Sequence, residues 1–112
     1  MPPHLASITA LSCTVIATGP IAERRFVTFA GAQAGLDAVV KGISQIGGIA
    51  GDALPLTLVG LVDMVAGADI AVGAELVSDA NGLPIPKGAN TNVAARADTA
   101  ALAGQRVGVL MR

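Results

Sequence analysis

Glycine and proline interrupt this chain at short intervals, and this spacing strongly limits the folds open to it. The 112 residues include 14 Gly and 6 Pro, and the runs of Val, Leu and Ile between them are short. Strands of about five or six residues fit such runs, whereas an average helix needs about 11 or 12. Many short strands separated by turns are typical of a small β-sandwich or barrel. We therefore expect an all-β fold, a small single-domain sandwich or barrel of short strands.

The clearest expected strand covers residues 56–65, because both of its faces are largely apolar, as in a strand that is covered on each side. Pro55 has to open this strand or lie at a sheet edge. Asn81–Gly82 predicts a type I′ hairpin turn. Residues 93–102 are rich in alanine and fit a helix or a strand, of which we favour the strand. The other expected strands cover residues 11–18, 21–29, 36–43, 75–78, 83–85 and 106–111, with loops at 31–35, 44–52 and 87–92.

Two stretches of the sequence resemble each other. Ile21-Ala22 is followed shortly by Phe26–Thr28, and Ile70-Ala71 is followed by Leu76–Ser78; a glycine precedes each pair. The shared pattern describes a turn that leads into a short strand. In a chain this rich in Ala and Gly, the similarity alone does not establish a repeat.

The charge of the chain excludes one class of partner. Seven basic residues stand against eight acidic ones, which gives a net charge of -1, and only 13% of the residues are charged. A nucleic-acid-binding protein needs a basic surface that neutralises phosphates, and often aromatic rings on which bases stack. Phe26 and Phe29 are the only aromatic residues. We therefore expect no nucleic-acid partner.

Residues that commonly carry catalysis or hold metals are scarce. Cys13 is the only cysteine and His4 the only histidine, which excludes an internal disulfide, a cysteine-built zinc site and a Ser-His-Asp triad with a well-anchored base. Cys13 is expected on the apolar side of strand 11–18, as part of the core. We expect no enzymatic activity, no cofactor and no metal.

Three acidic residues are the remaining candidates for chemistry. Asp63 and Asp69 flank a strand end and are candidates for an acid–base pair, but no polar cluster accompanies them in the sequence. We favour solvated turn carboxylates for both. Asp79 begins a segment that resembles the start of a calcium loop, but the acidic ligands that should follow are absent, so a turn is favoured.

Residues 5–22 form an uncharged stretch whose length is close to that of a membrane-spanning helix. Several Ser and Thr residues interrupt it, Gly19-Pro20 breaks its end, and no Lys or Arg precedes Arg24 as a secretory signal would require. The alternation of Leu11, Cys13, Val15 and Ala17 with more polar neighbours fits a half-buried strand better. We expect no membrane segment.

The composition predicts exposed apolar surface. The chain is 53% hydrophobic, mostly through small and aliphatic residues, and its few charges are too scarce to cover the surface. Exposed apolar patches commonly mark contact surfaces, so we expect an oligomer or a component of an assembly. In the apolar N-terminal arm, the candidate contact residues are Leu5, Ile8, Leu11 and Val15, which are suited to adding a strand to a neighbour's sheet. Arg24 and Arg25 are further candidate contact residues: they either line a solvated strand edge or meet an acidic neighbour in an assembly.

Several segments follow one another in an order that matches a known family pattern. They are TGPIAERRFVTFAGAQ (18–33), KGIS (41–44), AGDALPLTLVG (50–60), VAGADIAVGAELVSDANGLPIP (65–86) and ARADTAALAGQRVGVLM (95–111). The most specific part is Gly67–Gly82, with the pattern G-A-x-I-A-x-G-x-x-L-x-S-D-x-x-G. In this order the segments resemble the small head-decoration proteins of tailed bacteriophages, also called capsid cement proteins. The arm before Thr18 and the Gly-rich stretch 47–51 depart from the family pattern.

The resemblance implies a division into an arm, residues 1–17, and a β decoration domain, residues 18–112. It implies a protein made in the bacterial cytoplasm that binds the outside of the phage head, with the major capsid protein as partner. It also implies oligomers, with a trimer favoured, and no catalytic residues. A phage tail or fibre component stays open as an alternative, as does a host-surface or carbohydrate-binding module, for which two Phe residues are a poor supply of aromatic platforms.

Overall fold

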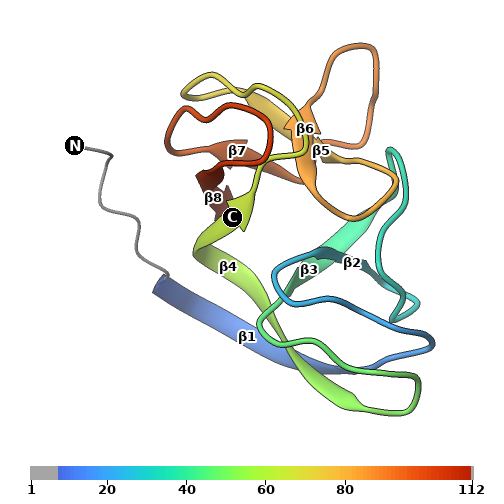
Figure 1. The fold of residues 1–112 in the computed structure, drawn as a ribbon. Coiled ribbons are helices and arrows are strands. Elements are labelled where there is room, and N and C mark those ends of the chain that lie inside the picture. The colour runs from blue at the N-terminus through green and yellow to red at the C-terminus, as the bar shows by residue number, and fades with distance from the viewer. Residues whose placement is uncertain (1–7, 112) are drawn as a thin grey trace.

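The computed structural model describes residues 8–111, and this part of the chain contains strands and no helix. The strands build an antiparallel, nearly closed, barrel-like sheet, which confirms the all-β prediction (Figure 1). The strands are β1 (Ile8–Ile16), β2 (Phe26–Thr28), β3 (Val40–Ser44), β4 (Ala53–Val65), β5 (Glu75–Ser78), β6 (Pro84–Pro86), β7 (Ala95–Ala97) and β8 (Arg106–Met111).

The long strand β4 organises the sheet. The strand order is β2-β3-β4-β8-β7-β5-β6, and β1 pairs with β4 outside this path. β1 pairs with residues 53–61 of β4, whereas β3 pairs at residues 56 and 57 and β8 pairs at residues 60–65. A strand has only two hydrogen-bonding edges. β3 and β8 therefore share one edge of β4, and β1 occupies the other.

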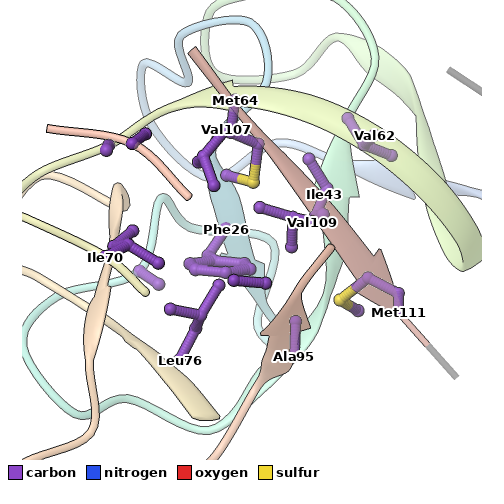
Figure 2. Packing of buried hydrophobic residues seen from close by; sticks show 14 residues of the cluster. Phe26, Ile43, Val62, Met64, Ile70, Leu76, Ala95, Val107, Val109 and Met111 are labelled. Atoms are coloured by element: carbon purple, nitrogen blue, oxygen red, sulfur yellow. The ribbon is translucent and has the colours of Figure 1, made fainter. Parts of the chain in front are cut away.

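β4 contributes to two hydrophobic clusters. Leu54 and Leu56 belong to a small cluster that Cys13 and Val15 of β1 cover. Val62 and Met64 belong to a larger cluster around Phe26 (Figure 2). Between the two pairs lies Gly60, with φ 150°, where an added Cβ would lie 2.2 Å from the carbonyl oxygen of Ile8. Only glycine allows β1 to approach β4 so closely at this point.

One loop conformation occurs four times in the described chain, at residues 18–25, 45–52, 67–74 and 98–105, and each copy leads directly into a strand. The fourth residue of each copy forms an isolated β-bridge, Ile21 with Gly48 and Ile70 with Ala101. The seventh residue has a positive φ in every copy: Arg24 54°, Gly51 92°, Gly73 79° and Gly104 85°. We call 18–25 with 45–52 the first loop pair, and 67–74 with 98–105 the second loop pair.

The hydrogen bonds within the two loop pairs are equivalent. In the first, the backbone N–H of Arg24 donates to the Ser44 carbonyl and that of Gly51 to the Ala17 carbonyl. In the second, the matching donors are Gly73 and Gly104, and their acceptors are the carbonyls of Ala97 and Ala66, respectively. Each acceptor residue immediately precedes a loop copy and is small and buried. The similarity between residues 21–28 and 70–78 in the sequence therefore reflects a duplicated structural unit.

The strand predictions at residues 56–65, 75–78 and 106–111 are confirmed, with β4 starting three residues early and containing Pro55. The prediction of a strand from residue 36 is wrong, because β3 begins only at Val40. The preceding loop is fixed by Asp37, which has φ 55° and whose carboxylate accepts the backbone N–H of Asn92. In the ambiguous segment 93–102, the strand is present but covers only Ala95–Ala97.

The hairpin turn between β5 and β6 differs from the predicted type. A type I′ turn needs positive φ at both central residues, but Gly82 has φ 77° and Asn81 is not among the residues with positive φ. Instead, the Asp79 N–H donates to the Leu83 carbonyl, so Ala80–Gly82 form a three-residue loop. The Asp79 carboxylate accepts the N–H groups of Asn81 and Leu83, and it thereby serves as a turn residue, as predicted.

Candidate functional site

The first candidate contact site is the free edge of β1. Among the described residues, β4 is the only strand that pairs with β1 (Figure 1). No charged residue or proline lies between Ile8 and Ile16. The register shifts on either side of Leu11, which is 54% exposed although the alternation predicted it on the apolar side. A long, uncharged edge strand with exposed apolar side chains is a ready template for pairing with another chain.

The predicted arm residues have different places in the structure. Ile8 and Leu11 are exposed on β1, whereas Val15 is half-buried against the small hydrophobic cluster. Leu5 lies outside the described residues. β1 pairs with β4 of the same chain, so this part of the arm belongs to the protein's own sheet. The surface left for a neighbour is its free edge.

The second candidate site is an ion-pair cluster around Asp63 of β4. Arg24 Nη1 donates to Asp63 Oδ1 and Arg106 Nη1 donates to Asp63 Oδ2, both at 2.5 Å. The Asp63 side chain is only 10% exposed. A buried carboxylate is stable only when it is paired, and here two guanidinium groups pair it. The prediction that Asp63 is a solvated turn carboxylate is therefore wrong.

Asp69 does not join this cluster. Its carboxylate accepts the backbone N–H of Ala103 at 2.9 Å, across the second loop pair. Asp63 and Asp69 therefore hold separate partners, and the arrangement offers no acid–base pair. Among residues 8–111, no group of three or more His, Cys, Asp or Glu is placed to hold a metal. The same residues contain no helix that could span a membrane.

The two adjacent arginines have separate partners within the chain. Arg25 Nη1 donates to the carbonyl of Asn81 in the β5–β6 turn at 2.8 Å. Arg24 turns to Asp63, so the acidic residue that it meets belongs to its own chain. Neither Asp63 nor Arg106 was predicted as a contact residue, because they lie 39 and 82 positions from Arg24 and no local pattern links them.

Arg24 has a positive φ, a backbone conformation that is unfavourable for residues with a Cβ atom. The three matching loop positions are glycines, and Arg24 shares their positive φ. For a residue with a Cβ, this region costs about 1–2 kcal/mol. An ion pair with a 40% exposed arginine stabilises the folded chain by only about 0.2–1 kcal/mol. By these magnitudes, Arg24 stabilises the fold no more than the glycines at the matching loop positions do.

The cluster borders a hollow of about 250 Å³ between loop 18–25, β4, the β5–β6 turn and the start of β8. Three arginines and two acidic residues line it, with apolar groups completing the wall. The lining residues are Ala22, Glu23, Arg24, Arg25, Asp63, Met64, Val65, Leu83 and Arg106. Because the basic groups outnumber the acidic ones, the hollow carries a net positive charge.

Apolar side chains are exposed elsewhere, as the composition predicted. Ile49 and Leu102 occupy the same position in two loop copies and are 68% and 59% exposed, and Phe29 is 66% exposed. Together with the β1 edge, they give this chain more than one apolar surface patch. The molecule is thus a small all-β protein with exposed apolar side chains, which are candidate contact surfaces, on its edge strand and loops.

A small all-β domain with exposed apolar side chains on an edge strand and loops fits the class of proteins that form assemblies. A family model described as phage cement protein matches residues 7–112. The chain belongs to this phage cement protein family, which confirms the resemblance seen in the sequence. The match also includes most of the arm, from residue 7 onward, which the sequence resemblance had left outside. Membership makes the chain a phage structural protein associated with the virion.

A solved structure with the same fold is the head fiber gp8.5 N base of bacteriophage phi29. The TM-score is 0.73 over 91% of this chain and 93% of that chain, at 20% sequence identity. At this identity the likeness concerns the fold. No curated protein matches the chain.

Proposed function

We propose that this protein binds the outer surface of the phage capsid and stabilises the expanded head. The observation that carries the proposal is the match to the phage cement protein family over residues 7–112. The exposed apolar residues of β1 and of the loop copies supply contact surface for such binding. The partner is the major capsid protein, and the site of action is the capsid exterior after synthesis in the host cytoplasm.

Stabilisation by a cement protein follows from mass action. A subunit that binds the assembled shell and not its dissociated subunits stabilises the shell by RT ln(1 + [L]/Kd), about 2.7 kcal/mol at a concentration of 100 Kd. Each subunit bound to the shell contributes this stabilising free energy. A modest affinity for each copy is therefore sufficient when many copies bind one shell.

Self-association is part of the proposal, with a trimer favoured. The free edge of β1 is the surface best suited to it, because main-chain hydrogen bonds to an added strand contribute affinity without charged side chains. Ile8 and Leu11 then become buried in the contact.

A second function is favoured by one observation, the fold shared with the head fiber base of phi29. In that case the protein binds the head and serves as an attachment point for another component. It then does not serve to stabilise the shell. The two functions differ in what the purified protein does alone. A cement protein stabilises the shell by itself, whereas a fibre base binds without stabilising.

The experiment is co-sedimentation of the purified protein with expanded shells assembled from the cognate major capsid protein. We expect saturable binding at a fixed ratio of copies per shell, together with greater resistance of the shell to heat. Binding without added resistance would favour the fibre-base function. Absence of binding would contradict both head functions and favour a tail component or a host-surface binder.

A further inference from the structure

The arginines around Asp63 retain hydrogen-bonding capacity after they have paired with it. Arg24 and Arg106 each reach Asp63 through one Nη1 atom. A guanidinium carries five N–H donors in a planar fork, so each has Nη2 and Nε groups available for a second acceptor. The two side chains are 40% and 66% exposed, so a partner can reach both arginines from outside.

The charge balance of the hollow calls for one further negative group. Arg24, Arg25 and Arg106 face Asp63 and Glu23 around one cavity of about 250 Å³. These arginines are three of only seven basic residues in a chain whose net charge is -1. Such a concentration of positive charge in a weakly charged chain attracts an anion to this one place.

The backbone of Arg24 gives an independent argument for a binding role. Its loop position is glycine in the three matching copies, and Arg24 takes the positive φ that suits glycine. Strain of this kind clusters at binding sites, where the surrounding structure holds a side chain in place. The strained turn directs the guanidinium to the buried Asp63 carboxylate, which fixes the orientation of its fork.

We propose that the Arg24–Asp63–Arg106 cluster is a docking site for an acidic side chain of the major capsid protein. The incoming carboxylate accepts hydrogen bonds from the free guanidinium donors, and Asp63 holds the two arginines at the right spacing for it. Exposed Val65 and the neighbouring Leu83 supply the apolar rim of the same hollow. This inference rests on the proposed capsid binding and specifies which surface is used.

The test compares Arg24→Gly with the unmodified protein in co-sedimentation with expanded shells. Glycine fits the backbone at this position and leaves Arg106 paired with Asp63, so the variant is expected to fold. We expect its affinity for shells to fall by about tenfold or more, since a charge-assisted contact is lost. Arg24→Lys, which keeps the charge but loses the fork, is expected to bind less tightly than the unmodified protein.

Arg96→Gln is the matched control. Arg96 also pairs with a carboxylate, Glu75, at 3.7 Å and is half exposed, but it lies on β7 and does not line the hollow. Its removal lowers the charge equally and is expected to leave the affinity unchanged. Circular dichroism and thermal melting establish that both variants are folded.

The outcomes separate the two proposals. Equal affinity of Arg24→Gly and the unmodified protein would overturn the docking site while capsid binding stands. Equal weakening by Arg96→Gln would also overturn it, because a general charge effect would then explain the loss. If the unmodified protein does not bind expanded shells at all, the proposed function itself fails. Selective loss with Arg24→Gly supports the site.

Discussion

Asp63 shows how burial changes the role of one carboxylate. It lies in β4 between the core residues Val62 and Met64, so its side chain points to the opposite face of the strand. There two arginines cover it, and it is only 10% exposed. It therefore anchors β4 to the first loop pair and to β8.

Replacement of Asp63 by Ala tests this anchoring role. We expect a loss of about 2 kcal/mol of unfolding free energy, because two hydrogen bonds between charged groups disappear and two like charges remain close together. Denaturation by urea measures the loss. Asp69→Ala is the control, since it removes one exposed hydrogen bond and is expected to cost less than about 1 kcal/mol. Equal losses in the two variants would contradict the anchoring role.

Position seven of the repeated loop permits a direct comparison of residue types. Gly73→Ala introduces a Cβ at φ 79°, with no heavy atom within 4 Å of it, so only the backbone conformation is affected. We expect it to cost about 1–2 kcal/mol. Arg24→Gly at the matching position relieves strain, loses one of the two ion pairs of Asp63, in which the arginine is 40% exposed, and gains freedom in the unfolded chain. Because Arg106 still pairs with Asp63, the net change is expected to be within about 0.5 kcal/mol. Thermal unfolding of both variants checks this contrast, which a large loss in Arg24→Gly would refute.

Among the elements, β1 is both part of the sheet and an exposed edge. Its residues Cys13 and Val15 pack against the cluster that contains Leu54 and Leu56. Removal of residues 1–17 therefore exposes this cluster, and we expect the truncated chain to lose its cooperative unfolding transition. A truncated chain that unfolds like the full one would show that β1 adds nothing to the fold. Because truncation disturbs the sheet, a point substitution is the better probe of the edge.

Leu11→Lys is that probe. Leu11 is 54% exposed, so the lysine is expected to leave the stability of the isolated chain within about 0.5 kcal/mol. A charge on an edge strand opposes pairing with another chain, so self-association should weaken. Sedimentation at several concentrations measures this. Val72→Lys, at a 68% exposed position in a turn of the second loop pair, is expected to associate normally; the same weakening there would argue against the β1 edge.

The sequence predicted the elements whose signals are local. Residues 56–65 and 106–111 alternate or stay apolar over a strand length, and Pro and Gly bound them. The four loop copies were only partly recognisable, because backbone dihedrals and hydrogen bonds define them and few side chains are shared. Arg24 replaces the glycine in the first copy and so conceals the pattern. The Arg24–Asp63–Arg106 cluster joins residues far apart in sequence, and only the sheet topology brings them together.

At the scale of the whole molecule, β4 connects the two loop pairs. The first loop pair leads into β4 at Ala53, and the second follows it at Val65. The same strand places Leu56 in the small cluster and Met64 in the large one. β4 therefore links the two loop pairs directly, as suits a protein proposed to stabilise an expanded shell.

Both hydrophobic clusters include residues of β4. We therefore expect the half of the fold around the first loop pair and the half around the second loop pair to unfold together. We expect Leu56→Ala, in the small cluster, to cost about 2–5 kcal/mol and to lower the protection of amides in both halves by the same free energy. Hydrogen exchange of β5 and β7 amides, in strands that do not pair with β4, measures this coupling. If the substitution lowered protection only around β1 and β3, the halves would be separate folding units. Equal loss throughout would mean that a contact formed at the β1 edge also stabilises the second loop pair, because binding and folding are then linked through one cooperative transition.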